Sequence, residues 1–149
     1  MAGKEQRGVE GADPDLFRDR PYVLTGRDAV LEDWLARIGA RVVFLDAHEH
    51  DRLVAIASHL PQMASLAIAQ LIGDHGAAKV AGPGAIDMTR LALSSYDIWQ
   101  DILATNPEEI SAALGLAIEK LESLRAILND ERMSKEFAHA AAAARSLRA

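Results

Sequence analysis

The 149-residue sequence contains no cysteine, which excludes disulfides, thiolate chemistry and sulfur-ligated metals. It has few aromatic residues and no uninterrupted apolar stretch of about eighteen residues, which argues against a membrane span. No dense basic cluster occurs and the formal net charge is −6, which argues against nucleic acid or an anionic membrane as a partner. Residues 1–20 are too charged for a signal peptide, so we expect a cytoplasmic protein.

Half of the residues are hydrophobic, and alanine and leucine dominate them, which favours helix over strand. A chain of this length can bury about 68–70% of its unfolded surface around one core. From residue 47 onward only helix is indicated. We therefore expect an all-α domain over residues 47–149.

Residues 1–46 have a different pattern. Residues 1–20 are polar and predict a loop, and residues 22–24 and 41–45 predict two short strands. Between the strands, residues 27–38 predict an amphipathic helix that ends at Gly39. These elements predict a strand, helix and strand that form a remnant of an α/β layer, too small to be stable alone.

A long apolar helix is predicted from His48 to Gly73 and carries a polar stripe and a proline. Apolar residues cover most of its surface, so we expect burial nearly all round. Pro61 would cost about 3 kcal/mol in an ordinary helix interior, so the fold should use the kink or the carbonyl freed at Ala57. The stripe, spaced by seven, four and three residues along one helix face, consists of Asp51, Ser58, Gln62 and Ser65.

A second helix is predicted to begin at Pro107, because Asn106 suits the N-cap and Glu109 the third helical position. This helix carries a heptad seam that could pack within the chain or against a second copy. We favour a homodimer, because the helix from His48 to Gly73 would be about 39 Å long, against about 30 Å for a small domain. The seam consists of Ile110, Leu114, Ala117, Leu121, Leu124 and Leu128.

Three blocks resemble the C-terminal region of prephenate and arogenate dehydrogenases, in the same order and up to about Leu128. The first is similar to the segment that links that family's nucleotide domain to its helical domain. The second resembles the central helix of the helical domain, and the third resembles a later motif. The blocks consist of residues 1–10, 16–18 and 20–25, then residues 50–62, then residues 87–92, 99–102 and Asn106.

This resemblance implies a mainly α fold, namely a helical dimerisation domain after a short strand-helix-strand remnant. It implies a tyrosine-biosynthesis enzyme that oxidatively decarboxylates prephenate to 4-hydroxyphenylpyruvate with NAD or NADP. The family's catalytic histidine would precede Met1, so no catalytic residue is expected in this chain. The family's glycine-rich nucleotide fingerprint is also absent, since residues 82–84 have the wrong spacing. We therefore expect no cofactor binding and no activity from this chain alone.

Arg90 is the first candidate for substrate binding, because an arginine fork can hold a carboxylate through two parallel hydrogen bonds. By resemblance it binds the ring carboxylate of prephenate or arogenate, with Thr89 and Asp87 orienting it. The alternative is a surface arginine paired with Asp87, three residues earlier on a helix.

Ser58, His59 and Gln62 are predicted by resemblance to form the polar wall of the substrate site. His59 could instead be a hydrogen-bonded core residue, and Trp99 is expected in the core. Gln62 departs from the family, in which many members carry a histidine that touches substrate; glutamine cannot titrate near neutrality. Glu5 matches an acid near the cleft, although it could equally be a solvated acid on a mobile N-terminus.

No metal site is expected, although residues 48–51 include two histidines and an aspartate, because His50 and His59 fall on opposite faces of a straight helix. Two other functions stay open. The chain could be a stand-alone module that binds an aromatic or dicarboxylate ligand, or a purely structural helical dimer.

Overall fold

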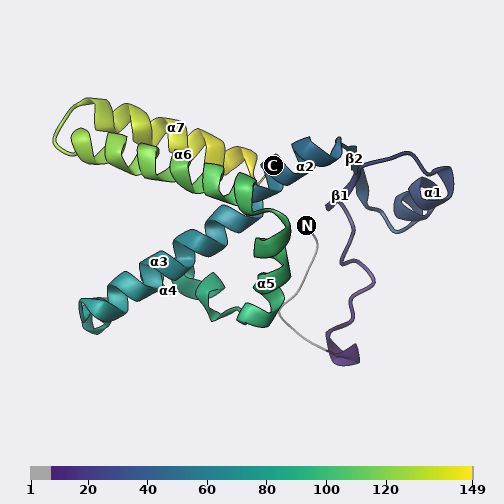
Figure 1. Cartoon of the computed structure of the whole chain (residues 1–149), viewed down its shortest axis with the longest axis horizontal. Coiled ribbons are helices and arrows are strands. Elements are labelled where there is room, and N and C mark those ends of the chain that lie inside the picture. Colours follow the sequence, from purple (N-terminus) through teal and green to yellow (C-terminus); the bar gives the residue numbers. More distant parts are fainter. Residues whose placement is uncertain (1–7, 149) are drawn as a thin grey trace. The chain divides into compact units, whose positions relative to one another are not determined.

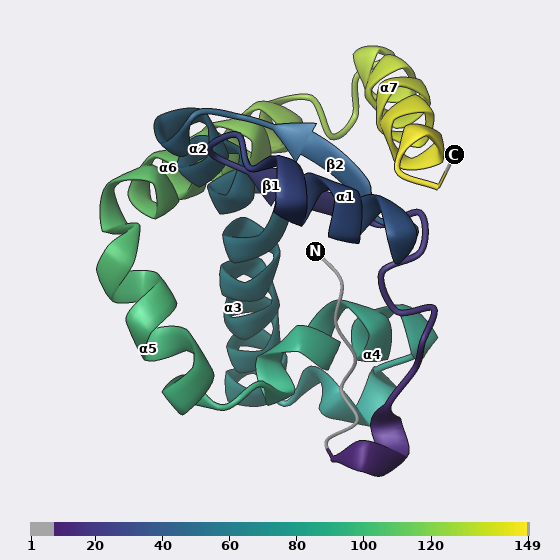
Figure 2. The same cartoon turned by 90° about the vertical axis from the view of Figure 1, so that its right-hand side faces the viewer.

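The computed structural model describes residues 8–148 and divides into two compact units, Met1–Ser58 and His59–Ala149. Helices dominate the described residues, and the few strands lie in the first unit (Figures 1 and 2). The predicted mainly α fold is therefore confirmed. The predicted domain boundary at residues 46 and 47 stays a prediction, since the compact units divide later, inside a helical stretch.

The first unit contains the expected strand, helix and strand. A 3-10 turn, η1 (Val9–Gly11), precedes β1 (Pro21–Leu24), and then α1 (Ala29–Arg37) leads to β2 (Arg41–Phe44). The two strands pair in parallel, with Pro21 opposite Arg41.

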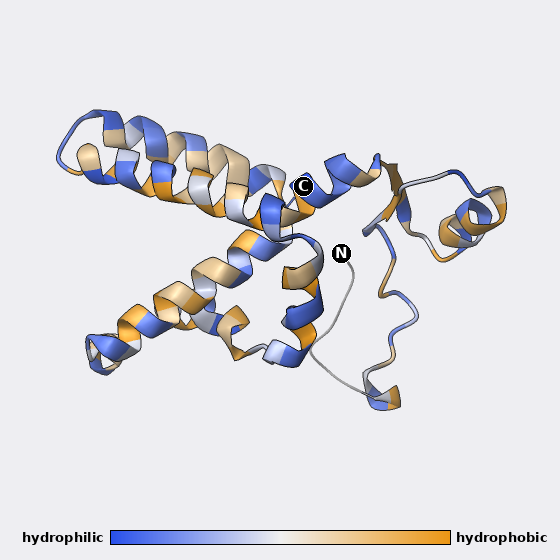
Figure 3. Ribbon diagram, viewed as in Figure 1, coloured by the Kyte–Doolittle hydropathy of each residue, from blue (hydrophilic) through white to orange (hydrophobic). Residues whose placement is uncertain are grey.

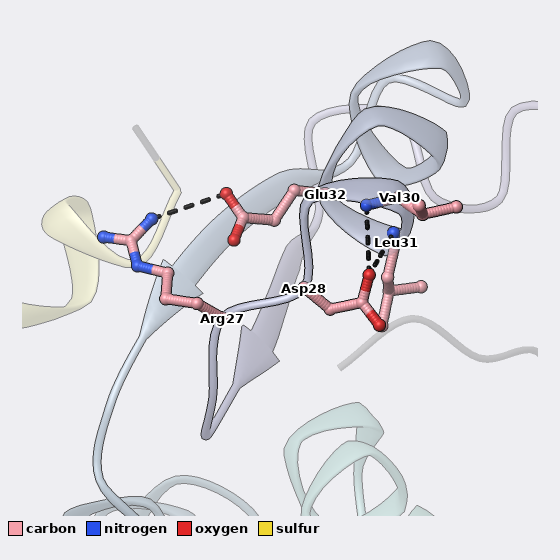
Figure 4. A network of polar contacts seen from close by, with 5 residues as sticks. All are labelled: Arg27, Asp28, Val30, Leu31 and Glu32. Carbon is pink, nitrogen blue, oxygen red and sulfur yellow. Dashed lines mark hydrogen bonds and ion pairs between the residues drawn. The ribbon is translucent and has the colours of Figure 1, made fainter.

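Polar contacts define the start of α1, and a glycine turn follows its end. The carboxylate of Asp28 accepts hydrogen bonds from the backbone N–H groups of Val30 and Leu31, both at 3.0 Å (Figure 4). Arg27 contacts Glu32 and stacks its guanidinium 3.5 Å from the centre of the Phe44 ring. After the helix the chain turns at Gly39, whose φ of 76° favours glycine.

The small parallel sheet carries exposed apolar side chains. Parallel sheets in proteins are normally covered on both faces. Here Trp34 of α1 is 64% exposed and Phe44 of β2 is 37% exposed. This unit thus leaves apolar side chains uncovered, and its assignment as a remnant of an α/β layer stays a prediction.

The long helix is present from Ala47 to Asp74, but Pro61 does not lie in an ordinary helix interior. The stretch consists of α2 (Ala47–Val54), a π turn labelled η2 (Ala55–His59), and α3 (Leu60–Asp74). Pro61 therefore falls in the first turn of α3, where a missing N–H group costs little. The π turn also changes the helical register, so the polar stripe does not follow one 3.6-residue period across it.

The expectation that this helix is buried nearly all round is wrong for a single chain. Leu53, Ile56 and Leu71 are 37%, 41% and 58% exposed. Among the described residues, this helix alone has the length and apolar composition that would allow a membrane crossing, a criterion that core helices of soluble proteins also meet. One small chain does not supply enough cover for a helix of this length.

In the second unit, α3 contacts the elements that follow it (Figure 2). A 3-10 turn, η3 (Ala77–Val80), leads to α4 (Pro83–Thr89) and to a second 3-10 turn, η4 (Arg90–Leu93). The chain continues through α5 (Tyr96–Thr105), α6 (Pro107–Ala126) and α7 (Arg132–Ser146). The elements in contact with α3 are η3, α4, η4 and α6.

The predicted start of α6 at Pro107 is confirmed, although the Asn106 side chain makes no cap hydrogen bond. Its heptad seam is only partly covered within the chain. Ile110 is 5% exposed, whereas Leu121 and Leu128 are 66% and 65% exposed. The beginning of the seam thus packs inside the unit and its far end does not.

The core is smaller than chain length predicted. Within the described residues the buried apolar side chains are distributed over both units rather than gathered in one core, because much of the apolar surface of the helices has no cover in a single chain. They are Leu24, Leu35, Ala55, Ile110, Ala113 and Ile127.

Candidate ligand-binding site

Two buried polar side chains of α3 hold the backbone of η4. Gln62 and Ser65 are each 2% exposed. The Gln62 Nε2 donates a hydrogen bond of 2.9 Å to the carbonyl oxygen of Leu91. The Ser65 Oγ accepts a hydrogen bond of 2.9 Å from the backbone N–H of Ala92. These bonds satisfy polar groups that would otherwise be costly to bury in an apolar helix.

Arg90 begins the segment that these bonds hold. It directly precedes Leu91, and its side chain is exposed. Thr89, the last residue of α4, donates its hydroxyl to the carbonyl oxygen of Ala85 at 2.8 Å, within its own helix. Asp87 lies on the same short helix and is exposed. The predicted trio of Asp87, Thr89 and Arg90 is therefore grouped at the junction between α4 and η4.

His59 is buried against Trp99. The histidine is 7% exposed, and its ring centre lies 5.9 Å from that of Trp99 in an edge-to-face arrangement. The contact joins the end of the π turn to α5, and Trp99 is only partly exposed, in keeping with a packing role. π turns occur frequently at functional sites, which supports His59, the last residue of this turn, as a candidate site residue.

Ser58 belongs to the first unit and lines a cavity of about 650 Å³ there. The cavity wall is mainly apolar and includes Tyr22, Leu53 and Val54. His50 also lines it and pairs with Asp51, with 2.9 Å between the histidine Nδ1 and the carboxylate. This cavity can accept an apolar group with a few polar contacts.

The structure thus separates the predicted site residues into two groups. In the second unit, Gln62 hydrogen-bonds Leu91, the residue after Arg90, and His59 is the first residue of this unit. Ser58, the preceding residue, belongs to the first unit. Glu5 lies outside the described residues. Over residues 8–148 no three metal-ligating side chains of His, Cys, Asp or Glu gather into a cluster that could hold an ion.

The sequence did not indicate which backbone groups pair with the polar side chains of α3. The carbonyl of Leu91 and the N–H of Ala92 receive the buried side chains, and nothing in their residue types signals that role. Ser65 was part of the predicted stripe but was not among the predicted substrate residues. Its polarity in an apolar helix was the available signal, because a buried hydroxyl requires a partner.

Comparison with known proteins identifies the family. The profile described as prephenate dehydrogenase, dimerization domain, matches residues 46–141. The chain therefore belongs to the prephenate dehydrogenase dimerization-domain family.

Two curated relatives show how much of a longer protein the chain matches. Prephenate dehydrogenase of Lactococcus lactis is 30% identical over 135 residues, which are 87% of this chain and 36% of that protein. Cyclohexadienyl dehydrogenase of Zymomonas mobilis is 28% identical over 138 residues, 84% of this chain and 47% of that protein. The chain thus spans about a third to a half of the length of these relatives.

Solved structures share the fold. Arogenate dehydrogenase from Synechocystis has a TM-score of 0.78 at 24% identity, covering 99% of this chain and 59% of that one. Prephenate dehydrogenase from Aquifex aeolicus, solved with hydroxyphenyl propionate and NAD+, has a TM-score of 0.76 at 21% identity, covering 99% and 56%.

Proposed function

We propose that this chain is the substrate-binding and dimerising portion of a prephenate or arogenate dehydrogenase of tyrosine biosynthesis. The complete enzyme would act in the cytoplasm and oxidatively decarboxylate prephenate to 4-hydroxyphenylpyruvate with NAD or NADP. Family membership and the dehydrogenase relatives support this proposal. The 149 residues contain no glycine-rich nucleotide fingerprint, so this chain alone would be inactive.

The observation that carries the proposal is the position of Arg90 at the start of a turn fixed by buried hydrogen bonds. Prephenate and arogenate both carry a carboxylate on the ring. A guanidinium can hold that group through two charge-assisted hydrogen bonds. An exposed arginine on a backbone held by buried hydrogen bonds meets this requirement.

The nicotinamide cofactor would accept hydride in the complete enzyme. The share of this chain is orientation of the substrate and placement of positive charge. Arg90 would hold the ring carboxylate, and Thr89 and Asp87 would shape the turn that carries it. His59, Ser58 and Glu5 stay candidates for the remaining wall of the site, whereas Gln62 is 2% exposed and contacts η4 instead.

Calorimetric titration with prephenate tests the binding role of Arg90. We expect Arg90→Ala to weaken binding by about 10- to 100-fold, because a hydrogen bond to a charged group contributes about 1.5–3 kcal/mol. Arg145→Ala, an exposed arginine of α7, serves as the control and should bind as the unaltered chain does. Equal affinity for Arg90→Ala and the control would remove Arg90 from the site.

A turnover assay tests the proposal that this chain alone is inactive. The purified 149-residue chain should produce no 4-hydroxyphenylpyruvate from prephenate and NAD. NAD-dependent product formation by this chain would overturn the proposal that it is inactive alone.

The proposed dimer is supported by exposed apolar side chains of α6 and α7. Figure 3 shows apolar and polar positions interspersed along these two helices. On α6, Leu116 and Ile118 are each 58% exposed in addition to the far end of the seam. Phe137 of α7 is 73% exposed. Burial of such side chains contributes about 25 cal/mol per Å² of apolar surface. A second copy of the chain is the occupant that the family's dimerization domain favours.

A further inference from the structure

Gln62 and Ser65 contact neighbouring backbone groups of one four-residue turn. The two side chains lie three residues apart on α3, and their partners, Leu91 and Ala92, are consecutive in η4. One bond is donated to η4 and the other is accepted from it. Together they fix both the position and the rotation of the turn.

The carbonyl oxygen of Leu91 accepts a second hydrogen bond, of 3.0 Å, from the backbone N–H of Ser94. The same oxygen thus links α3 to the end of η4. A four-residue 3-10 turn has few internal hydrogen bonds, so contacts from α3 contribute a large share of its order.

Gln62 is also too buried to face a ligand in this arrangement. It is 2% exposed, and its only amide nitrogen donates to the Leu91 carbonyl. A glutamine amide keeps its donor from acidic to alkaline pH, because it does not titrate. The contact with η4 therefore does not change with pH in the way that a histidine contact would.

We propose that Gln62 and Ser65 are positioning residues, which affect ligand binding through Arg90 by fixing η4 and do not touch the ligand. The inference rests on the proposed function only in assigning anion binding to Arg90. The fixing of η4 itself is testable without any ligand.

Amide hydrogen exchange measured by NMR on the full chain tests the first step. Gln62→Met removes the donor at nearly constant volume, and Ser65→Ala removes the acceptor with a smaller change. We expect exchange at Ala92 and Ser94 to accelerate by about 10- to 100-fold in both variants, as loss of a buried hydrogen bond implies. Gln70→Met, at an exposed position of the same helix, is the control and should change neither rate.

Prephenate titration of single and double variants tests the second step. We expect Gln62→Met to weaken binding by about tenfold, and Gln62→Met combined with Arg90→Ala to bind no worse than Arg90→Ala alone. Gln62→Asn, which keeps an amide but shortens its reach, should weaken binding less than Gln62→Met does.

The outcomes separate the two proposals. Unchanged amide exchange at Ala92 and Ser94 in a folded Ser65→Ala variant overturns the proposal that α3 fixes η4. This conclusion does not depend on the affinity for prephenate. Additive loss in the double variant shows that Gln62 binds ligand directly and overturns its positioning role. If Arg90→Ala binds prephenate normally while exchange at η4 accelerates, the proposed anion site fails and the fixing of η4 stands.

Discussion

Helices α3 and α6 invert the usual relation between polarity and burial. On α3, the polar residues Gln62 and Ser65 are among the most buried side chains of the described chain. On α6, Leu116 and Leu121 are 58% and 66% exposed. The two helices belong to the same compact unit, so the contrast reflects what each one contacts.

The difference lies in where each helix obtains its partners. The polar groups of α3 are satisfied inside the chain, by η4. On the apolar face of α6, Ile110 and Ala113 are buried within the chain, whereas Leu116 and Leu121 are exposed. One chain therefore builds the turn that carries Arg90, whereas it leaves much of the apolar surface of α6 uncovered.

The strongest test of this contrast alters the exposed face of α6. A charge at Leu121, or at Leu128 just after the end of α6, should prevent dimerisation, because a buried unpaired charge is costly. We expect the double substitution of both leucines by glutamate to raise the dimer dissociation constant by at least about thirtyfold, the effect of losing about 2 kcal/mol at an interface. Sedimentation equilibrium measures it.

The control for this experiment is Glu122→Gln, at an exposed polar position of the same helix. It should leave the dimer intact. A double-glutamate variant that stays dimeric would place the interface elsewhere.

A second test of comparable size truncates the covered end of the same helix. Ile110→Ala should lower the free energy of unfolding by about 2–5 kcal/mol, because it leaves a cavity in packed surroundings. Urea denaturation of dilute protein measures this loss. Ile118→Ala, the same change at a site that is 58% exposed, should cost less than about 1 kcal/mol. Equal costs would remove the distinction between the two ends of α6.

The smallest effect concerns two exposed ion pairs, one between α6 and α7 and one at the turn that joins them. The Asp130 carboxylate accepts hydrogen bonds from both the backbone N–H and the guanidinium of Arg132, each at 2.8 Å. The side-chain bond from Arg132 holds the pKa of Asp130 below its ordinary value. Likewise, the hydrogen bond from Lys120 lowers the pKa of Glu136.

These lowered pKa values set the direction of the pH dependence. The contribution of Asp130 to the folded state is complete above its unfolded pKa of about 4 and is lost as pH falls through the lower folded pKa. An NMR titration of the Asp130 carboxyl should therefore show a midpoint below about 4. Arg132→Ala should return the midpoint toward that ordinary value, while titration at the ordinary value in the unaltered chain would contradict the contact.

Much of the fold could be predicted because local signals specify local structure. Gly39 marks the end of α1 through a positive φ, and Pro107 marks the start of α6. The strands were found from short apolar runs, to within a residue at each end. The sequence correctly indicated that the helix is irregular near Pro61. It did not predict the π turn, which places Pro61 in the first turn of α3 rather than in a helix interior.

The candidate site was less predictable, for a different reason. The stripe on the long helix indicated that buried polar side chains need hydrogen-bond partners, but the sequence did not identify those partners. The partners of Gln62 and Ser65 are backbone groups 29 and 27 residues away, and every residue type offers those groups.

The sequence by itself determined the helical class, the start of α6 and the presence of Arg90 within a motif that resembles the family's. Only the tertiary structure decided that Gln62 and Ser65 turn inward to η4 and that Leu116 and Leu121 of α6 stay exposed. The physical reason is that helix and turn signals act over a few residues, whereas burial and hydrogen-bond pairing depend on which distant segments the chain brings into contact.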